Sequence, residues 1–147
     1  MIHADSSKHR FSSPAFRLRK HADYQRVYKS SRKQFGTQMT YFFLLRSPLG
    51  ADGLARWDAD PEAARVGLTV GKVMGKAVDR NRIKRRMREA VRSQLSLIHL
   101  PVDVVLHPRR SVIDLDFEAL EREVGAVFRA IQRTVAKQAA VLPQTAD

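Results

Sequence analysis

The chain has 147 residues, enough for one domain with a modest core, and 44% of them are hydrophobic, which indicates a folded protein. It carries 27 Lys and Arg against 15 Asp and Glu, a formal net charge of +12, and this balance points to nucleic acid, less often to an anionic membrane. The absence of cysteine excludes disulfides and thiolate metal sites. Because there is neither an apolar run of about 20 residues nor an apolar signal segment, we expect a cytoplasmic protein.

The first of two basic segments is residues 1–33, with nine basic and two acidic residues. Residues 1–15 within it are polar and rich in Ser and His, so we expect a flexible N-terminal extension. A helix is expected over about 21–31, because Tyr24, Val27 and Tyr28 recur at the i, i+3, i+4 spacing of one helix face. From spacing alone, ordinary core packing is the simplest role for these aromatic side chains.

The central part of the chain predicts a strand followed by a loop. Residues 35–47 are dominated by aromatic and apolar side chains on both alternating faces, which is typical of a central strand. Gly36 marks a bend that would divide this stretch into two short strands. Two prolines, two glycines and four acidic residues then predict an inserted loop over 48–64.

The second basic segment, residues 65–92, holds ten basic and two acidic residues and is expected to share a face with the first. It begins with a predicted strand over 65–70 and a glycine-containing turn. In the helix that follows and runs to about Leu97, apolar side chains fall on one side and arginines on the other at about 100° per residue. The apolar side consists of Ile83, Met87, Ala90, Val91, Gln94 and Ile98, and the other side of Arg82, Arg85, Arg88 and Arg92.

The last third of the chain predicts a strand over 102–107 and a final helix N-capped by Asp114 or Asp116. The buried stripe of that helix is expected to consist of Leu120, Val124, Val127, Phe128, Ile131 and Val135. Residues 139–147 are expected to form a flexible tail. The order of elements predicts an α+β fold, with one small domain over 16–138 in which helices pack on a sheet.

No arrangement of residues indicates catalysis by the protein itself. The five histidines show no metal-ligand spacing, and the acidic residues form no pair near the basic helix. No nucleophile elbow or Walker-type loop is present. We therefore expect no catalytic and no metal-binding side chain. Gly71, Gly75 and the nearby lysines can offer N–H groups and charge to a phosphate, although such turns are common for other reasons.

The basic helix has three interpretations. A single run of charge is usually a solvated surface. Here the charge density is high and arginine is favoured over lysine, so mutual repulsion is destabilising unless an anion relieves it. A helix-turn-helix that reads DNA needs a short helix immediately before this one, but a strand and a glycine turn precede it. The pattern therefore favours contact with RNA.

A series of motifs runs through the same segment. They are Arg65-Val66-Gly67-Leu68-Thr69-Val70, Lys72, Gly75-Lys76-Ala77-Val78, Arg80-Asn81-Arg82-Ile83-Lys84-Arg85 and Arg88-Glu89. Together they resemble the signature of the bacterial ribonuclease P protein component, and the Arg-Asn-Arg block is their most specific part. Residues 16–28 are similar to that family's first helix and 103–106 to its last strand, so the resemblance covers about 16–135.

The chain departs from the family pattern at several positions. Residues 71–73 are Gly, Lys and Val where the family often has Ser and two lysines, which removes one candidate phosphate contact. Tyr24 and Tyr28 stand where phenylalanines are common, and tyrosines can stack equally well. The loop over 48–64 and the N-terminal extension are additions to the pattern.

The resemblance implies both a fold and a function. The fold is a single α+β domain with a central, mostly antiparallel sheet of about four strands, three helices and a left-handed β-α-β crossover, the reverse of the general handedness. The function is that of the protein subunit of ribonuclease P, whose catalytic RNA uses Mg²⁺ to remove the 5′ leader from precursor tRNA. The implied partners are the catalytic RNA and precursor tRNA, with no cofactor held by protein side chains and no membrane or DNA contact.

The resemblance also implies two contact surfaces. Contact with the catalytic RNA is expected from Lys72, Lys76, Arg80, Asn81, Arg82, Lys84, Arg85 and Arg88. Arg80 projects toward the apolar side, so bracing of the helix N-terminus is an alternative role for it. The 5′ leader is expected in a cleft between the first helix and the sheet, lined by Arg17, Arg19, Tyr24, Tyr28, Lys29 and Phe43.

Two other classes of protein share some of these features. A plain RNA-binding protein, such as a ribosomal subunit, has the same charge and fold size. A protein-only nuclease would need an acidic cluster, which the sequence does not offer.

Overall fold

The computed structural model describes residues 17–46 and 64–141. The predicted N-terminal extension, nearly all of the inserted loop and residues 142–147 lie outside the described residues. The helices are α2 (His21–Ser30), α3 (Ala77–Gln94) and α4 (Phe117–Val141), and the strands are β1 (Gln34–Phe35), β2 (Met39–Leu45), β3 (Arg65–Leu68) and β4 (Val102–Pro108). Short 3₁₀ turns lie at Lys72–Met74, Leu95–Leu97 and Arg110–Ile113.

The four strands form one sheet in the order β1-β2-β4-β3. The β1–β2 and β2–β4 pairs are antiparallel, and β3 pairs with β4 in parallel. The predicted α+β fold, with three helices on a mostly antiparallel sheet of four strands, is therefore confirmed for the described part of the chain. Helix α3 makes the crossover between the parallel strands, and the left-handed sense of that crossover stays a prediction.

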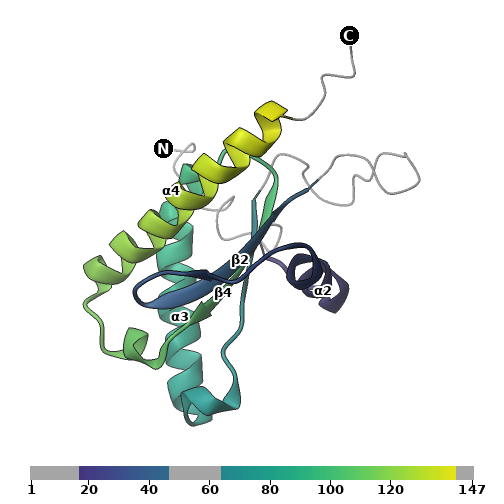
Figure 1. Cartoon of the computed structure of the whole chain (residues 1–147). Helices are drawn as coiled ribbons and strands as arrows, with labels where there is room; N and C mark the ends of the chain where they lie inside the picture. The colour runs from purple at the N-terminus through teal and green to yellow at the C-terminus, as the bar shows by residue number, and fades with distance from the viewer. Residues whose placement is uncertain (1–16, 47–63, 142–147) are drawn as a thin grey trace, which may run out of the picture.

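The sheet separates two layers of apolar side chains, because successive residues of a strand point to opposite faces. The face carrying Met39, Val104 and Leu106 packs against α3 and α4 and forms the main core. The other face, which we call the α2 face, includes Val105, and this residue packs with Val27 of α2. Figure 1 shows α2 on one side of the sheet and the two long helices on the other.

The predicted apolar stripe of α4 is confirmed, and that of α3 is confirmed up to Val91, whereas Gln94 is half-buried and Ile98 is buried beyond the end of α3. Ile83, Met87, Ala90 and Val91 are buried on α3, and all six residues of the predicted stripe of α4 are buried. Fully burying one such aliphatic side chain contributes roughly 1.5–3 kcal/mol, so these stripes fix both helices on the sheet. None of the helices in the described ranges combines the length and apolarity of a membrane span.

Some element boundaries differ from the predictions. The division of the predicted strand 35–47 into two strands is confirmed. It falls at Gly36, whose N–H donates to the carbonyl of Met39 at 2.8 Å. Helix α4 continues to Val141, so the first residues of the predicted tail are helical. The reason is that this end of the helix is rich in alanine, the strongest helix former.

A buried carboxylate joins α2 to the strands at one end of the sheet. Asp103 of β4 is 0% exposed and accepts hydrogen bonds from Arg65 Nε and Nη2, both at 2.8 Å, and from Arg46 Nη1 at 2.7 Å. Arg26 of α2 lies 3.7 Å from its second oxygen and also pairs with Asp23. Burial lowers the pKa of Arg46, and the charge of Asp103 opposes that shift.

We predict that Asp103→Asn lowers the free energy of unfolding by about 3–5 kcal/mol, because it leaves partly buried guanidinium groups facing a neutral amide. Urea denaturation at neutral pH measures this decrease. Glu89→Gln is the matched control, since the ion pair of Glu89 with Arg92 is exposed and its removal is expected to cost less than about 1 kcal/mol. Equal decreases for the two variants would contradict a structural role for the Asp103 cluster.

Candidate nucleic-acid interface

Helix α3 and the turn before it present most of the predicted RNA-contacting side chains to solvent. Lys72, Lys76, Asn81, Arg82, Arg85 and Arg88 are exposed, whereas Arg80 and Lys84 are half-buried. Gly75 closes the turn with a φ of 128°, a conformation that favours glycine, and Arg80 Nε donates to its carbonyl at 3.2 Å. Arg80 therefore braces the start of α3, which is the alternative role expected from its position.

One arginine of this helix points into the protein. Arg86 donates through Nε to the carbonyl of Val112 at 3.1 Å and through Nη2 to the carbonyl of Leu115. Its guanidinium also lies over the ring of Phe117, 5.8 Å from the centroid. Arg86 thus links α3 to the segment before α4 and is not part of the exposed cationic surface.

A pocket of about 140 Å³ lies at the outer edge of β3. There the first described residues run beside the strand: Arg17 pairs with Val66, and the N–H of Leu18 donates to the Val66 carbonyl at 3.0 Å. The pocket is lined by Arg17, Leu18, Tyr24, Val66, Gly67, Leu68, Lys84, Arg88 and Val91. It therefore joins the two basic segments of the sequence on one face, as their charge predicts.

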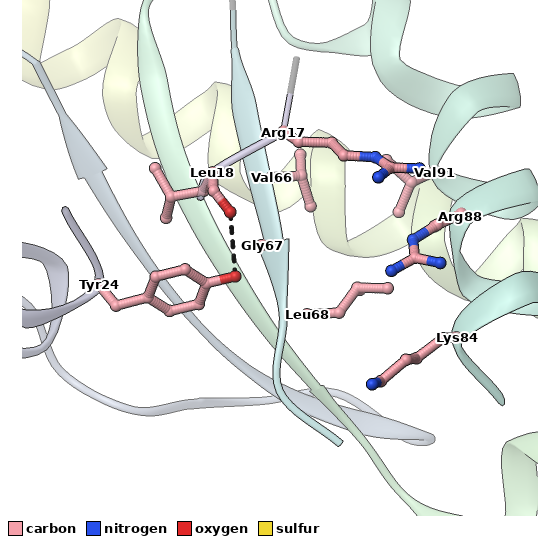
Figure 2. A pocket seen from close by; sticks show the side chains of 9 residues that line it. All are labelled: Arg17, Leu18, Tyr24, Val66, Gly67, Leu68, Lys84, Arg88 and Val91. Atoms are coloured by element: carbon pink, nitrogen blue, oxygen red, sulfur yellow. Dashed lines mark hydrogen bonds between the residues drawn. The ribbon is translucent and has the colours of Figure 1, made fainter. Parts of the chain in front are cut away.

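Three cations meet at this pocket. Figure 2 shows Arg17 reaching past Val66 toward Arg88, with Lys84 one helical turn away from Arg88 on the same side of β3. No acidic side chain is among the described residues that line the pocket. Burial lowers the pKa of Arg88, and the charge of Arg17 lowers it further. An anion bound here would relieve that repulsion, and guanidinium groups suit phosphate oxygens.

Tyr24 closes the pocket from the other side of β3. Its hydroxyl donates to the carbonyl of Leu18 at 3.1 Å, as Figure 2 shows. Burial raises the pKa of Tyr24 and the neighbouring Tyr28 raises it further, so the hydroxyl stays a donor at neutral pH. A Cβ on Gly67 would lie 2.3 Å from this hydroxyl oxygen, so the tyrosine occupies the space that the glycine leaves.

The α2 face of the sheet carries a second group of aromatic side chains. The half-buried Tyr28 lies edge-on to Phe42, with ring centroids 4.9 Å apart. Its hydroxyl lies 2.9 Å from His107 Nε2 and 3.3 Å from Thr69 Oγ1. Tyr28, Phe42 and His107 therefore form a partly exposed aromatic track from α2 across β4 to β2.

Five of the six predicted leader-contacting residues lie in three places near the pocket and the α2 face. Arg17 and Tyr24 line the pocket, Tyr28 belongs to the aromatic track, and Arg19 and Lys29 are exposed on and just before α2.

Phe43 does not join them. It stacks with Tyr41 at 6.2 Å on the opposite face of the sheet, packed against the main core. The prediction that Phe43 lines the cleft is wrong, because its side chain points to the other face of β2. The neighbouring residue, Phe42, points to the α2 face instead.

Three further features were not predicted from the sequence. Phe42 and His107 were not assigned to the site, and Lys84 and Arg88 were assigned only to the catalytic RNA, although they line the same pocket as Arg17 and Tyr24. Knowledge of the register between β2 and β4 would have shown that Phe42 and His107 lie on the same face of the sheet as α2. Within the described ranges, no group of three or more His, Cys, Asp or Glu side chains is arranged to hold a metal ion.

The fold and this site define a small, strongly basic α+β protein in which a cationic helix and an aromatic sheet face meet at one edge strand. Residues 13–132 match the family model described as Ribonuclease P. The ribonuclease P protein component of Bacillus velezensis is 33% identical over 113 residues, covering 77% of this chain and 86% of the relative. That of Finegoldia magna is 32% identical over 77% of this chain and 88% of the relative.

Solved structures agree with this relationship. The Staphylococcus aureus RNase P protein superposes with a TM-score of 0.62 at 26% identity, covering 80% of this chain and 95% of that one. The Thermotoga maritima RNase P protein, at 22% identity and a TM-score of 0.62 over 78% of this chain and 96% of that one, shares the fold. The chain belongs to the ribonuclease P protein component family. It is thus part of the ribonucleoprotein endoribonuclease that matures the 5′ end of tRNA, and an RNA subunit is its partner.

The half-buried position of His107 predicts a dependence of stability on pH. Burial and the charge of Lys33 lower its pKa below the ordinary value of 6.5. The unfolded chain then binds more protons than the folded one as the pH falls below about 6.5, so the free energy of unfolding decreases there and is fully retained above it. We expect His107→Gln, which keeps an acceptor for Tyr28, to flatten this decrease in denaturation curves measured between pH 7 and pH 5. His99→Gln, at an exposed position, is the control, and a flattening of the same size in that variant would exclude His107 as the source.

Proposed function

We propose that the protein binds the catalytic RNA through the outer surface of α3 and holds the 5′ leader of precursor tRNA in the β3-edge pocket and along the aromatic track. The observation that supports this most directly is the pocket itself, where Arg17, Lys84 and Arg88 converge beside Tyr24 with no acidic side chain in the lining. This arrangement matches a strand of RNA, which offers phosphates to cations and flat bases to aromatic rings.

The side chains of α3 divide between the two tasks. Lys84 and Arg88 are one turn apart and line the pocket, so they are suited to the leader. Arg82 and Arg85 are exposed and do not line it. Their planar guanidinium groups can each bind a phosphate through two hydrogen bonds, which suits the backbone of a folded RNA.

The aromatic track supplies affinity without sequence preference. Stacking of a base on an aromatic ring contributes roughly 1–3 kcal/mol, and every base has a flat face that can stack. Tyr28 and Phe42 are both half-buried, so each keeps part of its ring accessible. Such a surface can hold leaders of many sequences, as an enzyme acting on many precursors requires.

In this proposal the chemistry belongs to the RNA. The Mg²⁺ ions that cleavage requires are held by the catalytic RNA, and the protein lowers the repulsion between two polyanions by placing cations between them. Reconstitution with the RNA subunit at limiting Mg²⁺, followed by cleavage of a precursor tRNA, tests whether the protein acts in this way. A cytoplasmic location stays a prediction.

We predict that Arg82→Ala combined with Arg85→Ala weakens binding to the catalytic RNA and flattens its salt dependence. Removing one neutralised phosphate lowers the slope of log K against log salt by about 0.7–0.9, so the pair is expected to lower it by roughly 1.4–1.8. Binding titrations at several salt concentrations measure the slope. The control is Arg129→Ala combined with Arg133→Ala, which removes the same charge from the exposed side of α4. Identical slopes for the two double variants would place the interface elsewhere.

Arg17→Ala combined with Arg88→Ala is expected to reduce the affinity of the reconstituted enzyme for leader-bearing precursor roughly tenfold or more, because hydrogen bonds to charged groups contribute about 1.5–3 kcal/mol. Affinity for mature tRNA is expected to change little. These exposed cations test the pocket better than Tyr24, whose hydroxyl also holds the Leu18 segment in place. The α4 double variant serves again as control, and equal reductions for precursor and mature tRNA would overturn the assignment of the pocket to the leader.

A further inference from the structure

The most exposed aromatic ring in the described part of the chain lies beyond the aromatic track. Phe35 of β1 is 72% exposed, although its strand pairs with β2. The register places Phe35 opposite Thr40, and Thr40 opposite His107 of β4. Side chains directly opposite each other in an antiparallel pair lie on the same face, so all three stand on the α2 face.

The spacing of these residues leaves room for a flat ligand. Neighbouring strands lie about 4.8 Å apart, so the backbones at Phe35 and His107 are separated by roughly 10 Å. Only the small, half-buried Thr40 stands between them. The ring of His107 already lies 5.4 Å from that of Phe42 and is hydrogen-bonded to Tyr28. Phe35 therefore continues the aromatic track toward the β1–β2 hairpin.

The charge around this ring favours a polyanion. Lys33 precedes Phe35 by two residues and is exposed, and its charge acts on His107. Arg109, also exposed, donates through Nη1 to the carbonyl of Thr37 in the hairpin at 3.1 Å. An acidic side chain does reach the hairpin, that of Glu123, but it accepts the N–H of Gln38 and belongs to α4 on the other face of the sheet.

The same observations disfavour a second copy of the chain as the occupant. The cations Lys33 and Arg109 of this region would repel an identical surface, and the formal net charge of the chain is +12. Strand β1 has only two residues, too short an edge to pair with another chain. A base of single-stranded RNA, by contrast, brings a flat face for the ring and phosphates for the flanking cations.

We propose that Phe35, with Thr40 and His107, forms an additional stacking site for one base of the 5′ leader, farther along the strand than the bases on Tyr28 and Phe42. This site rests on the proposed function, because it assumes that the leader follows the α2 face of the sheet. It would add a further gain in affinity when the leader becomes long enough to reach the hairpin.

The test uses the enzyme reconstituted with its RNA subunit and precursors whose leaders differ by one nucleotide at a time. Beyond the gains from the pocket and from Tyr28 and Phe42, wild-type affinity is expected to show one further rise, at the leader length that reaches the hairpin. Phe35→Ala is expected to abolish that rise, a decrease of roughly 5- to 150-fold for one stacked base, whereas Phe35→Trp retains it. Thr134→Ala is the control, since Thr134 is exposed and lies on α4, on the other face of the sheet and away from the proposed RNA contacts. Thermal unfolding of each variant reports whether the fold is intact.

An abasic nucleotide in the leader makes the test specific for stacking. Placed at the nucleotide where the rise occurs, it is expected to weaken the wild type as much as Phe35→Ala does and to weaken the Phe35→Ala variant no further. Additive decreases would overturn the proposal. So would equal decreases for every leader length, or sedimentation of the wild type as a dimer that Phe35→Ala converts to a monomer.

The outcomes also separate this site from the function on which it rests. If Phe35→Ala has no effect while the Arg17 and Arg88 substitutions discriminate precursor from mature tRNA, the additional site is wrong and the leader assignment stands. If neither Phe35→Ala nor the Arg17 and Arg88 substitutions weaken binding of precursor more than binding of mature tRNA, the assignment of the leader to this face is wrong.

Discussion

The buried carboxylate of Asp103 is the interaction on which the arrangement of this protein depends. It holds guanidinium groups from the end of β2 and the start of β3, with a third from α2 nearby. An unpaired carboxylate at 0% exposure would be too costly to keep ionised, so these elements must meet at this point. Their meeting fixes the position of β3, and with it the edge where Arg17, Tyr24 and α3 form the pocket.

Arginine has three distinct roles in this chain, decided by what each guanidinium faces. Arg46 and Arg65 face a carboxylate and join strands. Arg80 and Arg86 donate to backbone carbonyls and fix the ends of loops. Arg88 faces another cation at the pocket, so the folded protein keeps a repulsion that an RNA phosphate would relieve. Some of the arginines that give the chain its positive charge therefore stabilise the fold, and only the other cationic side chains are available to bind RNA.

The aromatic residues show why a correct element can still give a wrong site. Strand β2 was predicted as central because both of its faces are apolar. For the same reason, the sequence does not distinguish the face of Phe42 from that of Phe43. Pairing with β4 settles the phase, since Phe42 stands opposite Val105 and Phe43 opposite Val104. A shift of one residue exchanges the two faces, so the sequence pattern alone is equally compatible with Phe42 or Phe43 in the cleft.

The sequence by itself determined the α+β class, the order of the described helices and strands, the apolar stripes of α3 and α4, and the family. Local spacing is sufficient for these, because helical and strand periodicity and the Arg-Asn-Arg motif are properties of neighbouring residues. The charge of the two basic segments predicted that they share a face. Only the tertiary structure decided which arginines are paired with carboxylates, which face of β2 meets α2, and which cations of the two segments meet in one pocket. Those facts depend on contacts between residues far apart in the chain, such as Arg17 with Val66 and Tyr28 with His107, and no local pattern records them.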